Sequence, residues 1–305
     1  MYTMKKQLYI FSLLIIIVFF SCGKSEATPD RDDPANDEFS IKDQIAKATF
    51  VKSIEYDTLI NPHAGVRQVN LQLRTTSSQP IALYVVEVDL KHPDIAIRVG
   101  MPDDGDAFKL QTVQAISEAN DKAGNRVIAA VNADFFYWTG EPWGPVVKQG
   151  NILKQSFYDT WHGFFAIDKD KNPRIGSSIN FLDTYPLQEA VGAVERLINN
   201  GVKFNQGNTE RHPRTMIGYT KDNVIYMVVV DGRQPAHSIG MTFAELSEVM
   251  FALKVQEAIN LDGGGSSTLV VKNSKTNSFE VKNKYSDAVP RAVANALTVV
   301  NLSAN

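Results

Sequence analysis

Residues 213–231, PRTMIGYTKDNVIYMVVVD, are the stretch that decides the fold class. Two runs rich in apolar and β-branched residues, 213–220 and 223–231, are separated only by Lys221 and Asp222. Such runs predict β-strands, and so short a polar connection predicts an antiparallel hairpin. The segment 166–175, AIDKDKNPRI, has the same pattern and predicts a second hairpin.

Further strands are expected on both sides of this hairpin. Short apolar runs, several with a period of two, predict strands at 69–73, 80–90, 94–99, 127–134, 161–168, 255–262, 266–272 and 295–302. Helices are expected at 112–124 and 187–201, and a third begins at Thr242, where Thr242 and Glu245 match a capping box. We therefore expect an α+β fold with a mixed, largely antiparallel sheet, a few packed helices and an active cleft at strand ends.

The amino-acid composition excludes several classes of protein and of functional site. The chain has 305 residues, 44% hydrophobic and 21% charged, which excludes a disordered, collagen-like or multi-span membrane protein. Its net charge of -3 gives no basic field to hold nucleic acid. The single cysteine excludes a disulfide framework, a CxxC zinc or redox site and, because it lies in the N-terminal segment, a cysteine nucleophile.

The N-terminus has the features of an export signal. Lys5 and Lys6 precede a thirteen-residue apolar run, 8–20, which is too short to span a bilayer. We predict a signal peptide at 1–21 and a lipidated Cys22, the alternative being a plain signal peptide with an incidental cysteine. The expected location is the cell envelope, periplasmic or at the cell surface, with the lipid anchor as the only membrane contact.

A tether and one domain are expected after the signal. Residues 22–38 contain no large apolar side chain and predict a flexible tether. Residues 39–305 are then a single domain, in which 39–80 is either integral or an appended element. We expect a monomer.

Three apolar strands end in aspartates: Asp134, Asp231 and Asp262. One such aspartate usually opens a turn, but three point to a site with catalytic carboxylates. Asn132 would lie on the same face as Asp134 if the strand persists, and together they could orient a hydroxyl or a water. The aromatic run 135–138 that follows is either a buried cluster or a stacking wall for a sugar ring.

The sharpest motif is the loop after Asp262. Gly263, Gly264 and Gly265 allow positive φ and close backbone approach, and Ser266, Ser267 and Thr268 add hydroxyl donors. Such a loop can form a nest of N–H groups that binds an anion. It is neither a P-loop nor a dinucleotide fingerprint, and a flexible linker is the alternative.

Three arginines suit an anionic ligand. Arg233 follows Asp231 across one glycine, Arg214 precedes a strand, and Arg291 lies near the C-terminus. Arginine grips phosphate through bidentate hydrogen bonds. The five histidines have no zinc-site spacing, and His162 and His237 are structural residues or general acids.

At these residues the sequence resembles the phosphodiester glycosidase family. The matching segments, in the family's order within residues 125–300, are NADFF (132–136), RTMIGYT (214–220), VVVDGR (228–233), NLDGGGSSTL (260–269) and RAVANALTV (291–299).

The resemblance implies hydrolysis of the glycosidic C1–O bond of a sugar phosphodiester, of the N-acetylglucosamine-1-phosphodiester type, or of a phosphorylated glycan. It implies that Asp262 or Asp134 activates water or attacks the anomeric carbon, while Asp231 orients Arg233. Arg214, Arg233, Arg291 and loop 263–267 would hold the departing phosphate. No cofactor is required.

Two alternatives stay open at the level of the sequence. The aspartates and Asn132 could hold Ca²⁺ or Mg²⁺ in a metal-dependent phosphodiesterase or phosphatase. The chain could also be a non-catalytic surface lipoprotein that binds anionic glycans.

Overall fold

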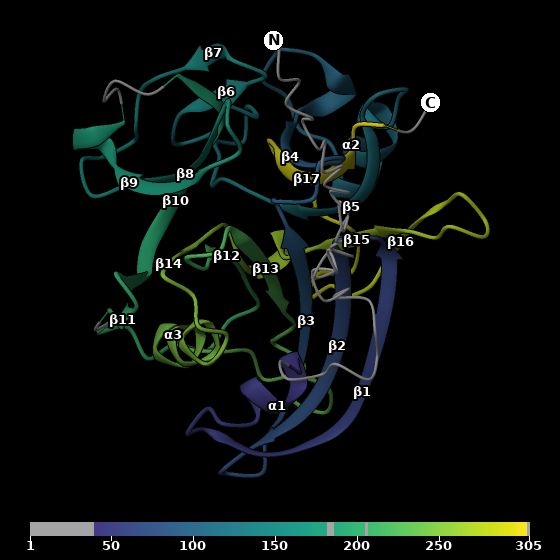
Figure 1. Cartoon of the computed structure of the whole chain (residues 1–305). Helices are drawn as coiled ribbons and strands as arrows, with labels where there is room; N and C mark the ends of the chain where they lie inside the picture. The colour runs from purple at the N-terminus through teal and green to yellow at the C-terminus, as the bar shows by residue number, and fades with distance from the viewer. Residues whose placement is uncertain (1–39, 182–185, 205–206, 304–305) are drawn as a thin grey trace, which may run out of the picture. The chain divides into compact units, whose positions relative to one another are not determined.

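The computed structural model describes residues 40–181, 186–204 and 207–303 (Figure 1). The predicted signal peptide, the lipidated Cys22 and the tether lie outside the described residues. Within the described ranges, no helix is long and apolar enough to cross a membrane.

Twelve strands of the described chain form the larger sheet. Its main path is β1-β2-β3-β13-β12-β14-β10-β6-β7, while β8 and β11 pair with β10 and β9 pairs with β8. The bounds are β1 Val51–His63, β2 Val66–Thr75, β3 Pro80–Asp89, β6 Val146–Lys148, β7 Asn151–Lys154, β8 Gly163–Asp168, β9 Pro173–Ser177, β10 Leu187–Asn199, β11 Val202–Lys203, β12 Arg214–Tyr219, β13 Val224–Val230 and β14 Glu257–Asn260.

Five further strands form a second sheet in the order β16-β15-β5-β17-β4. Their bounds are β4 Ile95–Gly100, β5 Arg126–Asn132, β15 Leu269–Lys272, β16 Phe279–Val281 and β17 Ala296–Asn301. Every pairing between the strands in the described ranges is antiparallel. The α+β, largely antiparallel prediction is confirmed, with two sheets rather than one.

The two sheets pack face to face, with helices outside them. Residues of β3 and β13 share one buried cluster with residues of β4, β5 and β17. Helices α1 (Ile41–Ile45) and α3 (Phe243–Ala252) pack on the other face of the larger sheet, and α2 (Val113–Asn120) packs on the smaller sheet. A strand such as β13 is therefore buried on both faces, which explains its unbroken apolar sequence.

Both predicted hairpins and two of the predicted helices are confirmed. β12 pairs with β13, and β8 pairs with β9. The Thr242–Glu245 capping box starts α3, whose apolar stripe is buried. The Thr112 side chain caps α2, which ends at Asn120 rather than at Gly124.

The predicted helix at 187–201 is wrong, because this segment forms strand β10. β10 pairs with β6, β8 and β14, so its small residues lie between other strands on both sides. Gly192 lies against the Cα of Gly144, an approach that a Cβ would prevent. Because β10 is buried on both faces, its sequence lacks the alternation of apolar and polar residues that is typical of a strand. Pairing with three neighbouring strands outweighed the local preference for a helix.

Residues 39–80 are not an appended element. β1 and β2 continue the larger sheet from β3, as the long strands in Figure 1 show. β2 pairs with β3 over nine residue pairs, from Val66 to Arg74.

Candidate functional site

The site is built where β5 and β14 end. The backbone N–H of Asp262 donates to the Ala133 carbonyl at 2.9 Å. The Asn132 amide donates to the Asp262 carbonyl at 2.7 Å and accepts the Thr215 hydroxyl at 2.7 Å. It also accepts the Thr268 N–H at 3.1 Å. Asn132 therefore ties β5 to β12 and to the glycine loop, and does not present a free amide beside Asp134 as its position in the sequence suggested.

Asp134 is a buried carboxylate with one unused oxygen. Its Oδ2 accepts the Gly144 N–H at 2.8 Å, while Oδ1 has no hydrogen bond of normal geometry to a described residue, although the Phe135 N–H also acts on the carboxylate. Gly144 and Gly192 pack against this carboxylate, and a Cβ on Gly192 would overlap Oδ2. Burial raises the pKa of Asp134 to about 7, and the charge of Asp262 adds to the rise, while the Gly144 N–H opposes it.

Asp262 is the second carboxylate with a raised pKa. Its Oδ1 accepts the Gly263 N–H at 2.8 Å. Burial raises the pKa of Asp262 to about 6, against the opposing effects of the Ser266 hydroxyl, the Gly263 N–H and the charge of Arg291. The charge of Asp262 contributes to the raised pKa of Asp134, so the two carboxylates lie close enough for one to act on the other. Strongly shifted carboxyl groups are typical of catalytic sites.

The glycine loop is a tight turn rather than an open nest of N–H groups. Gly264 adopts φ +61, and its N–H donates to the Pro213 carbonyl at 2.9 Å. The N–H groups of Ser266 and Ser267 bond back to Gly263 and Gly264. The predicted row of free N–H donors is therefore largely consumed within the loop. The Ser266 and Ser267 hydroxyls, in contrast, are buried without a hydrogen bond of normal geometry to any described residue.

Two arginines pack over this loop with their guanidinium groups. The guanidinium of Arg233 packs over Gly264, where a Cβ would lie 3.4 Å from Nη1 and Nη2, and Nη2 is 3.3 Å from His212 Nδ1. Arg291 pairs with Asp287 at 2.6 Å, and this ion pair packs over Gly265. Both cations are solvent-exposed above a loop that ends at buried hydroxyls.

Arg214 also reaches the glycine loop, where a Cβ on Gly263 would lie 3.7 Å from its Cδ, but its guanidinium is engaged by other partners. It is buried, its guanidinium carbon lies 4.0 Å from the ring centre of Phe243, and it donates to the carbonyls of Met241 and Glu210. Burial lowers the pKa of Arg214 to about 10. These contacts hold Arg214 at the start of α3.

Asp231 does not orient Arg233, and its carboxylate is fully engaged elsewhere. Its oxygens accept from Tyr84 Oη at 3.1 Å, His237 Nε2 at 2.8 Å, Asn283 Nδ2 at 3.1 Å and the Lys284 N–H at 3.0 Å. Burial and the Asp231 charge raise the pKa of Tyr84. These bonds connect Asp231 to three stretches of chain, at Tyr84, at His237 and at 283–284. His237 is part of this connection.

Aromatic residues line the chain beyond Asp134. Trp143 stacks between Phe135 and Tyr158, with ring centres 5.4 and 4.7 Å away. Trp138, from the predicted stacking wall, is 87% exposed, whereas Phe136 packs against the core beside α2.

Sequence reasoning missed three residues of this region: Trp143, Tyr158 and Asn295. The Asn295 side chain accepts the Asp134 N–H at 2.9 Å. Asn295 lies inside the motif 291–299, and this position could have indicated a role in the site. The two aromatic residues stand in no motif, so only the fold could place them.

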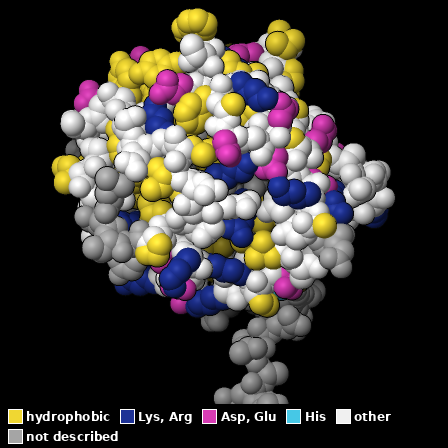
Figure 2. All heavy atoms as spheres, turned by 90° about the horizontal axis from the view of Figure 1, so that it is seen from above, with side chains coloured by type: hydrophobic (Ala, Val, Ile, Leu, Met, Phe, Trp, Pro, Cys, Tyr) yellow, Lys and Arg dark blue, Asp and Glu magenta, His cyan; other side chains and the backbone are white. Residues whose placement is uncertain are grey.

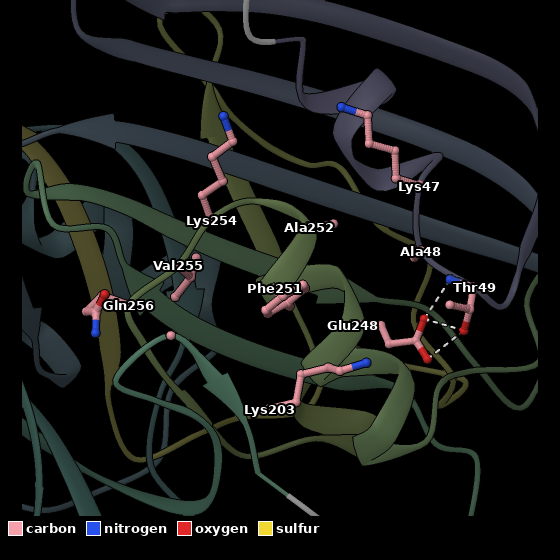
Figure 3. Close-up of a pocket in the computed structure, with 11 residues that line it drawn as sticks. Lys47, Ala48, Thr49, Lys203, Glu248, Phe251, Ala252, Lys254, Val255 and Gln256 are labelled. Atoms are coloured by element: carbon pink, nitrogen blue, oxygen red, sulfur yellow. Dashed lines mark hydrogen bonds between the residues drawn. The ribbon is translucent and has the colours of Figure 1, made fainter.

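A separate cavity of about 470 Å³ lies at the C-terminal half of α3 (Figure 3). Lys47, Lys203 and Lys254 line it, together with Phe251 and with Glu248, which accepts hydrogen bonds from Thr49. The predicted site residues do not line this cavity.

In the view from above, charged side chains of both signs and hydrophobic side chains are interspersed over the molecular surface (Figure 2). Across the described ranges, no group of three or more His, Cys, Asp and Glu side chains is arranged to hold a metal ion.

Comparison with known proteins now identifies the family. The family profile described as phosphodiester glycosidase matches residues 125–300, more than half of the chain. The chain belongs to the phosphodiester glycosidase family. All the candidate residues from Asn132 to Arg291 lie inside the matched segment.

The curated proteins that this chain resembles are distant from it in sequence. The bovine (Bos taurus) N-acetylglucosamine-1-phosphodiester alpha-N-acetylglucosaminidase is 29% identical over 167 residues, covering 48% of this chain and 31% of that protein. The SPbeta prophage-derived uncharacterized protein YomE of Bacillus subtilis (strain 168) is 34% identical over 89 residues, covering 29% of this chain and 13% of that protein. The chain thus spans less than a third of the length of these curated relatives.

A solved structure shares the fold. The catalytic domain of zebrafish N-acetylglucosamine-1-phosphodiester alpha-N-acetylglucosaminidase, auto-inhibited by its pro-peptide, has a TM-score of 0.61 and 20% identity, covering 80% of this chain and 87% of that one. At this identity the likeness concerns the fold alone.

Proposed function

We propose that the protein hydrolyses the glycosidic C1–O bond of a sugar phosphodiester of the N-acetylglucosamine-1-phosphodiester type, releasing free sugar and a phosphomonoester. Membership of the phosphodiester glycosidase family supports the reaction class. The observation that carries the proposal is the pair of buried carboxylates Asp134 and Asp262, both with raised pKa values, beside a glycine loop over which Arg233 and Arg291 pack.

The pair can divide the chemistry. Burial raises the pKa of Asp134 to about 7 and that of Asp262 to about 6, so Asp262 is the better candidate for the ionised carboxylate at neutral pH. The ionised carboxylate activates a water or attacks the anomeric carbon. Because a phosphomonoester leaves more readily than a sugar alkoxide, the reaction depends less on a general acid.

In this proposal, the side chains on and above the glycine loop stabilise the charge of the leaving phosphate. Arg233 and Arg291 lie over Gly264 and Gly265 and supply positive charge where the phosphate oxygen becomes charged. The Ser267 hydroxyl, which has no hydrogen bond of normal geometry to a described residue, is an additional donor for it, and the Ser266 hydroxyl lies beside Asp262. In this proposal Asn132 and Asp231 position the loops, and Arg214 supports the start of α3.

The bond that breaks is the decisive test. The protein is incubated with an N-acetylglucosamine-1-phosphate diester in water enriched in ¹⁸O, and both products are analysed by mass spectrometry. We expect the label in the sugar hydroxyl and none in the phosphate. Label in the phosphate would replace the proposal with a phosphodiesterase, and binding without any turnover would replace it with a glycan-binding protein.

Asp262→Asn removes the charge of the more acidic carboxylate while keeping its shape. We expect kcat to fall by about two to four orders of magnitude with an unchanged melting temperature or a higher one. Asp222→Asn is the matched control, because Asp222 is an exposed carboxylate in a hairpin turn. Equal kcat values in the two variants would refute the catalytic role of Asp262.

A further inference from the structure

An aromatic shelf adjoins Asp134. All three tryptophans of the chain lie between residues 138 and 161, and two of them belong to this shelf. Its members are Phe135, Tyr137, Trp143, Tyr158, Trp161 and His162.

The shelf is tightly stacked. The rings of Trp143 and Tyr158 are 4.7 Å apart and inclined by 18°, and those of Trp161 and His162 are 4.2 Å apart and inclined by 29°. His162 also meets Trp143 and Tyr158 edge-on, at 5.7 and 5.5 Å. The rings therefore support one another as a single unit.

Backbone bonds fix the shelf to the carboxylate pair. Trp143 precedes Gly144, whose N–H donates to Asp134 Oδ2. The N–H of Trp143 donates to the Phe135 carbonyl, and that of Tyr158 donates to the Trp143 carbonyl, both at 2.8 Å. The shelf thus starts one residue from Asp134, while the glycine loop with its arginines starts one residue from Asp262.

The outer rings of the shelf are open to solvent. Tyr158 is 54% exposed and stacks on the partly buried Trp143, and Trp161 is 56% exposed and stacks on the buried His162. Large apolar rings that remain exposed beside a polar site are typical of ligand-binding surfaces. The flat face of a pyranose ring, with its C–H groups, fits such a surface.

Two buried N–H groups inside the shelf lack acceptors. The Asp159 N–H donates to His162 Nδ1 at 3.2 Å, so Nε2 carries the ring proton. Burial lowers the pKa of His162, which keeps the ring neutral. His162 Nε2 and Trp143 Nε1 have no hydrogen-bond partner in the described ranges. Unpaired buried donors cost free energy, which a water or a ligand oxygen that enters the shelf would recover.

We propose that this shelf is the subsite for the sugar, which stacks on Tyr158 and Trp161, so that the substrate lies across the carboxylate pair with its phosphate toward Arg233. The proposal deepens the proposed function and rests on it for the identity of the sugar. The ligand class is a neutral pyranose such as N-acetylglucosamine.

The test measures binding without turnover. The full-length protein is titrated with N-acetylglucosamine alone and, separately, with inorganic phosphate, and binding is followed by tryptophan fluorescence and by calorimetry. We expect Trp161→Ala to weaken sugar binding by about tenfold and to leave phosphate binding unchanged. Arg233→Ala should show the opposite pattern.

The matched control is Trp138→Ala, which removes an 87% exposed tryptophan outside the shelf and should bind sugar as the wild type does. Trp161→Phe, which keeps a ring, should retain most of the affinity. Thermal melts show whether each variant is folded, and Tyr158→Leu replaces Trp161→Ala if the latter is unfolded.

Equal sugar affinity in Trp161→Ala and Trp138→Ala, or no sugar binding by the wild type, would overturn the shelf. These outcomes do not depend on catalysis. If the protein binds sugar through Trp161 but cleaves no phosphodiester, the shelf is supported as a sugar subsite and the proposed reaction is refuted. If the protein cleaves the diester and Trp161→Ala leaves KM unchanged, the proposed reaction stands and the shelf is not the sugar subsite.

Discussion

At the scale of single residues, the three strand-end aspartates have different surroundings. Asp231 accepts hydrogen bonds from four groups, which leaves it little capacity for a substrate. Asp134 keeps one unused oxygen, and burial raises the pKa values of Asp134 and Asp262. Their positions in the sequence predicted the same catalytic role for all three aspartates. The number of protein groups that donate hydrogen bonds to each carboxylate distinguishes Asp231 from the other two.

The raised pKa of Asp134 predicts how stability depends on pH. The folded value of about 7 lies above the usual 3.8, so the folded state binds more protons between these values. The contribution of Asp134 to stability is therefore fully present below about pH 4 and is lost as pH rises through 7. We expect the melting temperature of Asp134→Asn, relative to the wild type, to improve from pH 4 to pH 8. A difference that stays constant across this range would contradict the raised pKa.

The different surroundings of Arg233 and Arg214 predict different effects on KM and on the free energy of unfolding when each is replaced by alanine. Arg233 lies on the glycine loop, so Arg233→Ala should raise KM for a phosphodiester more than for an aryl glycoside. Arg214 lies on Phe243, so Arg214→Ala should lower the free energy of unfolding by about 1–3 kcal/mol and affect both substrates equally. Steady-state kinetics on both substrates and denaturant titrations measure these effects. A phosphodiester-specific loss in Arg214→Ala would restore its predicted phosphate role.

At the scale of elements, β10 shapes the space for the catalytic pair. This strand passes Asp134 at Gly192, where any Cβ would meet the carboxylate and the backbone of Gly144. β10 carries an irregularity of register next to Glu195, which has φ +62. A helix at 187–201, as the local pattern indicated, would leave β6, β8 and β14 without their shared neighbour.

Gly192→Ala tests this close approach. The added methyl overlaps Asp134 Oδ2 and Gly144 Cα, so we expect a loss of about 1–3 kcal/mol of stability and a large fall in kcat. Gly207→Ala is the control, because a Cβ at Gly207 has no heavy atom within 4 Å. Chemical denaturation and kinetics of the two variants are compared. A Gly192→Ala protein as stable and active as the control would show that β10 can move away from Asp134.

At the scale of the whole molecule, the long strands β1 and β2 belong to the same sheet as β12 and β14, which carry the site. Helix α3 packs on the face of that sheet opposite the second sheet. The site therefore draws on both sheets, because β5 belongs to one and β14 to the other.

Export and lipid attachment also belong to this scale, and the sequence alone predicts them. Cys22 follows a basic and apolar N-terminal segment. We expect Cys22→Ser to abolish incorporation of a labelled fatty acid and to move the protein from the membrane fraction to the soluble fraction of the producing cells. Equal labelling of wild type and variant would leave a plain signal peptide as the better hypothesis.

The sequence by itself determined the features that local chemistry encodes. The hairpin 213–231, the capping box of α3 and the glycine loop after Asp262 each depend on residues within a few positions of one another. Only the tertiary structure decided that 187–199 is a strand, that Asp231 is a connector, and that Trp143, Tyr158 and His162 meet beside Asp134. The physical reason is that burial and hydrogen-bond saturation depend on partners distant in sequence, which no local pattern specifies.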